Sequence, residues 1–326
     1  MWKLKVMGER FRSVRSSGDR ALPPGFILVL AVAAMSWGGP LVRFATAPAL
    51  AVAAWRLILS VAAIGLVLTV RRRWGDVTRL SGREWLLALA AGALLAAHFW
   101  SWITSLYWTS VASSVMLVNT QPIFAALLSA LLLGERASRR QWAGIGVAFI
   151  GAAVIGWSDF GQGASPLLGD LLAVAGALFA SGYFVIGRRL RQRLDLWVYT
   201  GVVYGMAALL LTIVVALDPG IPFANYPGTD WLVFAALAIG PMMIGHTGVN
   251  YALRFMPAFV ANLAMLGEPV GAMLIAWLLP AIGEAPSVQL LVGGAMIGIG
   301  IMVGAGTRPR VRPIQPWQGR KRGVFL

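Results

Sequence analysis

The sequence contains two similar stretches, HFWSWITSLYWTSVASSVMLVNTQPIFAALLSALLLGERASRRQWAGIGVAFIG at residues 98–151 and HTGVNYALRFMPAFVANLAMLGEPVGAMLIAWLLPAIGEAPSVQLLVGGAMIGIG at residues 246–300. Their offset stays at 147–149 residues, and the matched landmarks are His98 with His246, Pro122 with Pro269, Gly134-Glu135 with Gly283-Glu284, and Gly151 with Gly300. A nearly constant offset over such a length indicates an internal duplication, with one copy in each half of the chain.

Apolar residues dominate the whole chain around these stretches. Of its 326 residues, 59% are hydrophobic and 12% are charged, whereas a soluble domain carries about 25% charged residues. Many apolar runs reach the roughly 20 residues that cross a bilayer, and they lack the alternation of a membrane β-barrel. We therefore predict an all-α membrane protein with ten transmembrane helices, at 26–45, 48–70, 84–107, 109–133, 138–157, 168–188, 196–217, 230–253, 256–280 and 287–306.

The basic residues gather in alternate connecting segments. With ten spans, 25 of the 27 Lys and Arg residues fall in six segments on one side, whereas the opposite loops at 158–167 and 218–229 have none. The positive-inside rule then predicts an inner-membrane protein with both termini in the cytoplasm. We interpret residues 1–25 as a basic arm rather than a cleaved signal peptide, and residues 307–326 as a basic tail. This sorting also explains the net charge of +15 without a nucleic-acid partner.

Five spans in each copy is an odd number, so the second half (168–306) enters the membrane from the opposite side to the first half (26–157). Inverted repeats are typical of secondary transporters, whose substrate sites lie near the bilayer midplane between the halves. We find no phosphate loop, metal-ligand spacing or cofactor motif, and the chain has no cysteine. The pattern predicts a carrier of a small-molecule substrate embedded in the lipid bilayer.

Polar residues at membrane depth are candidates for the site, because each is costly there and usually faces a cavity or a partner. Asn119 and Gln121 stand beside Pro122 in the fourth span, and Asn262 and Glu268-Pro269 occupy the ninth. Proline frees a backbone carbonyl, which is tolerated where it meets a neighbouring helix or lines water. We expect two matched kinks at a cavity; the alternative is that they only shape a packed bundle.

Two charged residues inside spans, Glu268 and Arg56, have open roles. Glu268 could couple transport to protons, bind substrate, or form half of a buried pair. Arg56 could be its partner, a site residue, or an anchor that reaches the interface. Arg43, at the outer end of the first span, is expected to be an interfacial anchor.

Histidines and deep aromatic residues complete the candidate site. His98 and His246 occupy matching places in the repeats and could move a proton or bind a carboxylate, or could simply form a helix-to-helix hydrogen bond. Trp37, Trp102 and Tyr183 could wall a cavity suited to flat, amphipathic or cationic solutes. Each of these aromatic residues could instead serve packing alone.

Spans five and ten differ from the others because small residues run through them. Gly144, Gly146 and Gly151 lie in the fifth, and the tenth has several glycines at helical spacing. Small residues let helix backbones approach closely. We expect these spans to pack the bundle or to form the face of a homodimer, rather than to contact substrate.

The chain resembles the EamA type of the drug/metabolite transporter superfamily over about residues 26–306. Ser36-Trp37-Gly38 looks like its opening motif and Trp55-Arg56-Leu57 like the arginine motif of its second span. Its two long repeat motifs are similar to the stretches from Pro122 to Gly134-Glu135 and from Glu268-Pro269 to Gly283-Glu284. The chain departs from the pattern in two ways. An acidic residue precedes proline in one half only, and the sixth span lacks the Trp-Gly of the first.

The resemblance implies a ten-helix basket with a central cavity, and a secondary carrier that often exports amino acids or other metabolites. We accordingly predict an exporter of amino acids or related metabolites that works by alternating access and could be coupled to protons. The alternative within transport is multidrug efflux. An intramembrane enzyme or a sensor is less favoured, because neither a nucleophile or metal cluster nor a soluble signalling domain is evident in the sequence.

Overall fold

The computed structural model describes residues 22–42, 44–109, 111–157, 163–279 and 288–305. Within these ranges the regular structure is helical and contains no strand. Residues 1–21 of the predicted basic arm, the predicted tail, Arg43 and the Gly283-Glu284 pair lie outside the described residues. The all-α class is therefore confirmed for the part of the chain that carries the apolar runs.

The first half of the chain forms long helices joined by short turns. Its elements are α2 (Pro24–Met35), α3 (Gly38–Val42), α4 (Ala49–Val70), α5 (Trp74–Thr78), α6 (Gly82–Trp108), α7 (Val111–Val118), α8 (Gln121–Leu128), the π-helix η1 (Ser129–Leu133) and α9 (Arg139–Gly156). Two of these begin with a capping box, in which Ser81 and Glu84 close the start of α6 and Ser138 and Gln141 that of α9. Such boxes satisfy amide groups that the first helical turn leaves free.

The second half follows the same plan. Its elements are α10 (Pro166–Leu190), α11 (Leu196–Leu217), α12 (Gly228–Leu237), the π-helix η3 (Ala238–His246), α13 (Thr247–Ala252), α14 (Ala258–Met265), α15 (Glu268–Leu278) and α16 (Val288–Ala305). α12, η3 and α13 continue one another as a single path through the bundle. Pro241 lies inside η3, and proline is a common cause of such irregular helical geometry.

Among the described residues, seven helical segments are long and apolar enough to cross a membrane, which makes the chain a multi-pass membrane protein. They are 24–42, 49–70, 82–108, 113–133, 166–190, 196–217 and 228–252. Two shorter apolar helices cover 258–272 and 291–305. The predicted fifth span begins with Arg139-Arg140-Gln141, which lowers its hydropathy, and the predicted ninth span is interrupted at residues 266–267.

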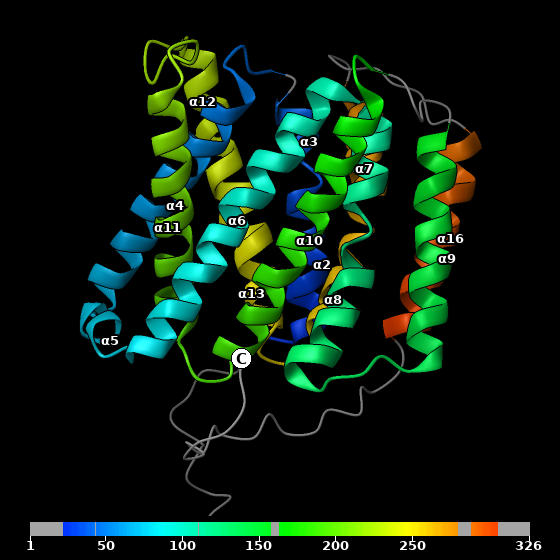
Figure 1. Cartoon of the computed structure of the whole chain (residues 1–326), viewed down its shortest axis with the longest axis horizontal. Coiled ribbons are helices and arrows are strands. Elements are labelled where there is room, and N and C mark those ends of the chain that lie inside the picture. The colour runs from blue at the N-terminus through cyan, green and yellow to red at the C-terminus, as the bar shows by residue number, and fades with distance from the viewer. Residues whose placement is uncertain (1–21, 43, 110, 158–162, 280–287, 306–326) are drawn as a thin grey trace, which may run out of the picture.

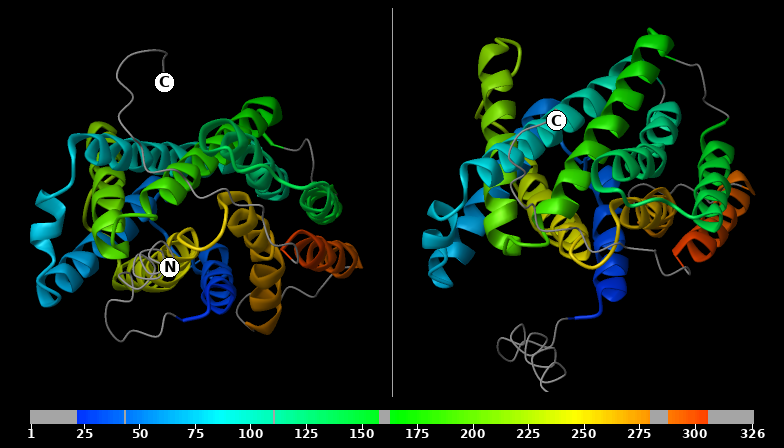
Figure 2. Two further views of the ribbon diagram at one scale, coloured as in Figure 1. Left: turned by 90° about the horizontal axis from the view of Figure 1, so that it is seen from below. Right: turned by 60° about the horizontal axis from the view of Figure 1, so that its bottom comes forward.

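The helices run roughly alongside one another and form a bundle with two parts (Figure 1). α10 packs along α6, and α11 packs against both α4 and α6. α9 and α16 pack along each other and lie together at one edge of the bundle in both further views (Figure 2). The central group of helices therefore holds the largest core, and the α9–α16 pair flanks it.

Glycines bring the backbones of α9 and α16 into direct contact. A Cβ added to Gly144 would lie 2.6 Å from the carbonyl oxygen of Gly300, and one added to Gly151 would lie 2.6 Å from that of Gly293. No side chain fits at either point, so glycine is needed for this approach. The small residues of the predicted fifth and tenth spans thus pack these two helices against each other within the chain.

Candidate functional site

Both prolines of the repeat stand at breaks in transmembrane helices. α7 ends at Val118 and α8 begins at Gln121, directly before Pro122. In the second half, α14 ends at Met265 and α15 begins at Glu268, directly before Pro269. The two matched breaks are confirmed, whereas the cavity expected beside them stays a prediction, because neither described cavity is lined by these residues. Discontinuous helices at corresponding places in two repeats are a common feature of transporter substrate sites.

Each break is hydrogen-bonded to the opposite half by a serine. The Ser181 hydroxyl on α10 donates to the carbonyl of Gln121 at 2.9 Å. The Ser36 hydroxyl, directly after α2, donates to the carbonyl of Glu268 at 3.2 Å. Both serines also bond a carbonyl one turn back in their own segment. The two bonds are equivalent under the internal repeat, so each half fixes the interrupted helix of the other.

Arg56 lies in the centre of this arrangement. Its side chain comes from α4, is 6% exposed, and places its guanidinium carbon 4.0 Å from the centre of the Phe99 ring on α6. Its Nη2 contacts the sulfur of Met242 at 3.2 Å, and its Nε has no hydrogen-bond partner among the described residues. Arg56 is therefore neither an interfacial anchor nor part of a close ion pair.

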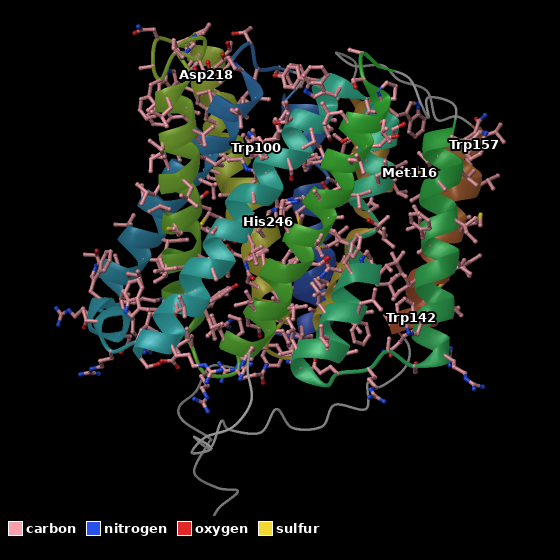
Figure 3. The ribbon with its side chains drawn as sticks, viewed as in Figure 1. Trp100, Met116, Trp142, Trp157, Asp218 and His246 are labelled. Carbon is pink, nitrogen blue, oxygen red and sulfur yellow. The ribbon has the colours of Figure 1, made fainter. Side chains whose placement is uncertain are left out.

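The two histidines occupy neighbouring places around Phe99. His98 Nδ1 lies 2.9 Å from the carbonyl of Gly176, and its ring stacks on Trp102 with centroids 6.1 Å apart. The His246 ring meets Phe99 edge-on at 5.6 Å and stacks on Phe184 at 6.3 Å. Figure 3 places His246 near the middle of the bundle's height. Both histidines are buried, so the matching positions of the repeat meet in one core.

A buried polar network lies on the next turn of the same helices. The amide nitrogen of Asn250 donates to the hydroxyls of Tyr183 and Tyr204. Tyr204 is in turn 3.2 Å from the Thr247 hydroxyl. Asn250 and both tyrosines are completely buried. Tyr183 was among the predicted site residues, whereas Asn250 and Tyr204 were not, although an asparagine inside an apolar span is the same kind of signal that identified Asn262.

The other predicted residues are less closely joined to this core. Asn119 and Asn262 each donate to the carbonyl four residues earlier in their own helix, at 2.9 and 2.8 Å. The Gln121 side-chain oxygen has no partner among the described residues, and Trp37 is 41% exposed. The structure therefore brings together His98, Trp102, Tyr183 and His246, and leaves Trp37, Asn119 and Asn262 apart from that polar cluster.

Glu268 is half-buried at the break of the second half. The described residues show no ion pair within 4.0 Å for Glu268 or for Arg56. The two opposite charges therefore do not form a close pair in this part of the chain.

Two cavities open in the described part of the molecule. The larger, of about 510 Å³, lies at the ends of α4 and α6 that face away from the basic loops, and its lining includes Leu50, Ile103, Thr104, Tyr107 and Trp108. The second, of about 430 Å³, borders α9 and is lined by Ile150, Ala153, Val154, Trp157 and Gln289. Neither cavity contains a predicted site residue. The larger one borders the helices that carry Arg56 and His98.

Comparison with known proteins places this architecture among membrane carriers. The chain is 30% identical to the uncharacterized transporter YdfC of Bacillus subtilis over 57% of its own length and 60% of that relative, so it spans less than two thirds of YdfC. It is 27% identical to the aromatic amino acid exporter YddG of Ancylobacter novellus, covering 72% of this chain and 82% of that one. A solved crystal structure shares the fold with a TM-score of 0.74 and 23% identity, over 86% of this chain and 96% of the other.

The family comparison reproduces the internal duplication. The model of the EamA-like transporter family matches residues 24–157 and matches again at residues 167–304. These two matches cover most of the chain, and each contains one broken helix with its proline. The chain therefore belongs to the EamA-like transporter family.

Proposed function

We propose that this protein is a secondary transporter of small organic solutes that exports amino acids or related metabolites. The observation that carries the proposal is that buried polar groups from both halves, Arg56 and His98 from the first and His246 from the second, surround the Phe99 ring inside an apolar bundle. Polar groups at this depth are costly and are usually kept for substrates or ions. The likeness to an aromatic amino acid exporter supports the substrate class. We propose a carrier rather than an enzyme.

We propose that ten transmembrane helices form two halves, residues 26–157 and 168–306, inserted in opposite orientations in the inner membrane. Alternating access would rock these halves about the core that contains Arg56. The sorting of basic residues supports cytoplasmic termini, and the matched serine bonds at the two breaks support the inverted symmetry.

Cysteine labelling tests the orientation, and the natural chain has no cysteine to interfere. Arg79 is exposed in the basic segment after α4. The variant Arg79→Cys is expected not to be labelled by a membrane-impermeant maleimide applied to intact cells. A cysteine at Ala224→Cys, exposed in the loop after α11, is expected to react. Reversed reactivity of the two positions would overturn the proposed orientation.

Multidrug efflux is the second candidate, and the cavity of about 510 Å³ favours it because its walls are mainly apolar and aromatic. A flux screen in proteoliposomes separates the two functions. We expect saturable flux of amino acids, whereas flux of cationic dyes without amino acids would establish efflux of drugs. Absence of flux for amino acids, nucleosides and dyes alike would reject the carrier proposal.

We propose that Glu268 couples transport to protons, because it is a carboxylate at a helix break inside the membrane. Glu268→Gln is expected to abolish the dependence of flux on an imposed pH gradient while leaving exchange of substrate between the two sides intact. Asp218→Asn, in an exposed loop, is the control and should respond to the gradient as the wild type does. Full pH-driven flux by Glu268→Gln would remove Glu268 from this role.

A further inference from the structure

Among the described residues, Arg56 differs from the other buried arginines in having no oxygen acceptor. Arg188 donates to the Glu135 carboxylate and to two backbone carbonyls, and Arg191 donates to two carbonyls. Arg56 contacts only a sulfur atom and an aromatic face. A guanidinium has five N–H donors, so most of the hydrogen-bond donors of Arg56 are unused.

A buried cation in this condition is energetically expensive. The free-energy cost of removing a cation from water is offset only when good hydrogen-bond acceptors replace the lost water molecules. Thioether sulfur is a weak acceptor. The Phe99 ring returns part of the cost as a cation–π contact. It covers one face of the guanidinium at 4.0 Å, whereas a carboxylate binds along the edge, where two N–H groups point in parallel.

A second unpartnered polar atom belongs to a side chain that packs against the same ring. His246 packs edge-on against Phe99 and is 5% exposed, and its Nδ1 has no partner among the described residues. With its proton on Nδ1, a neutral histidine is a hydrogen-bond donor. Arg56 and His246, which come from different halves, therefore each have an unpartnered nitrogen in the described part of the chain and both pack against Phe99.

The larger cavity lies on the same two helices as Arg56 and Phe99, nearer the side opposite the basic loops. It is lined by Leu50 on α4 and Ile103 on α6, and Arg56 and Phe99 lie deeper on the same two helices. At 1.5 Å per residue, the separation along each helix axis is about 6–9 Å. The apolar and aromatic lining of that cavity suits the side chain of a solute whose acidic end has reached Arg56.

We propose that Arg56, assisted by His246, binds the carboxylate of the transported solute and thereby selects amino acids over their uncharged or cationic analogues. This inference rests on the proposed function and refines it. Bidentate pairing with a guanidinium favours a planar carboxylate over an amide.

The test compares an amino acid with analogues that lack the carboxylate. The competing substrates in proteoliposomes are L-phenylalanine, its amide L-phenylalaninamide and its amine 2-phenylethylamine. The same comparison of acid, amide and amine is then repeated for each other amino acid that the wild type transports. We expect the wild type to prefer the acid by about tenfold to a hundredfold, the range for losing a hydrogen bond to a charged group. Arg56→Gln is expected to raise the KM for the acid by the same factor and to leave the amide unchanged. Arg56→Lys keeps the positive charge but lacks the paired N–H donors of the guanidinium, so it should recover part of the preference for the acid.

Arg71→Gln is the matched control, because Arg71 also stacks on an aromatic ring, that of Trp197 at 5.7 Å, but lies exposed at the end of the same helix. It should transport acid and amide as the wild type does. If the amino acid and its amide compete equally well for transport by the wild type, the proposed carboxylate binding by Arg56 is wrong. This outcome decides the question even if Arg56→Gln fails to fold. An unchanged acid preference in folded Arg56→Gln would do the same. A wild type that moves no amino acid rejects the proposed function, and this inference with it.

Discussion

Replacing Glu135 with alanine is expected to lower the free energy of unfolding by about 3–5 kcal/mol, because the change leaves the Arg188 guanidinium buried without its carboxylate. One oxygen of Glu135 accepts from Arg188 Nε at 3.0 Å and from Nη2 at 2.8 Å. The two side chains are 3% and 4% exposed. At this degree of burial, water cannot replace the lost partner.

The pair joins three segments at the end of the bundle that carries the basic loops. Glu135 follows Gly134, whose φ of 69° turns the chain after η1, and Arg188 lies in the last turn of α10. The remaining Arg188 nitrogen donates to the carbonyls of Leu253 and Arg254 after α13, at 2.8 and 3.0 Å. An opening of the bundle at this end would have to separate these segments.

The measurement is equilibrium unfolding of purified protein in mixed detergent micelles. The double variant Glu135→Leu with Arg188→Met should recover much of the lost stability, since apolar residues of similar volume can replace a buried pair. Asp76→Ala is the control, because Asp76 and Arg73 are also 2.8 Å apart but exposed. There the hydrogen bond and charge of Asp76 raise the pKa of Arg73, and we expect almost no change in stability. A loss for Glu135→Ala as small as that of the control would contradict the prediction.

The sequence predicted those parts of the fold that depend on local chemistry. Long apolar runs specify helices in a bilayer whatever their neighbours, and Pro122 and Pro269 each specify a break because proline lacks an amide hydrogen. The partners of the freed carbonyls depend on tertiary packing. Ser36 and Ser181 supply those partners from the opposite half, and nothing in the local sequence distinguishes these serines from others in the apolar spans.

The residues of the candidate site could be predicted firmly only where both copies of the repeat have the same residue type at equivalent positions. His98 and His246 were found because their positions match, and the structure brings both to Phe99. The sequence could not decide whether Arg56 is an interfacial anchor or a site residue. Its role depends on its depth in the bundle and on neighbours that are distant in sequence, such as Met242. Asn250 was missed although it is completely buried, because its tyrosine partners lie on two other helices and leave no pattern near it.

Asn250→Leu is expected to destabilise the protein by about 1–3 kcal/mol, since it leaves two buried tyrosine hydroxyls without their donor. Tyr183 comes from α10 and Tyr204 from α11, so the amide of Asn250 on α13 connects three helices. The Asn250 backbone is also fixed, because its carbonyl accepts from Arg191 Nε at 3.1 Å. Burial lowers the pKa of this Arg191 guanidinium to about 10, yet it stays charged at neutral pH and keeps donating.

Asn262→Leu is the matched control. Asn262 is 1% exposed and also lies in the second half, but its amide donates only to the Ala258 carbonyl in its own helix. That carbonyl lies where the helix backbone can still satisfy it, so we expect a smaller loss than for Asn250→Leu in the same unfolding measurement.

A triple variant separates the unsatisfied hydroxyls from any loss of packing. Adding Tyr183→Phe and Tyr204→Phe to Asn250→Leu removes both hydroxyls that lose the Asn250 donor, and the Thr247 hydroxyl keeps its bond to the Met242 carbonyl. Replacing hydrogen-bond partners by apolar groups of similar shape is nearly neutral. The triple variant should therefore be more stable than Asn250→Leu alone, even though it carries more substitutions. Equal or lower stability would show that the shape of Asn250, rather than its hydrogen bonds, holds α10, α11 and α13 together.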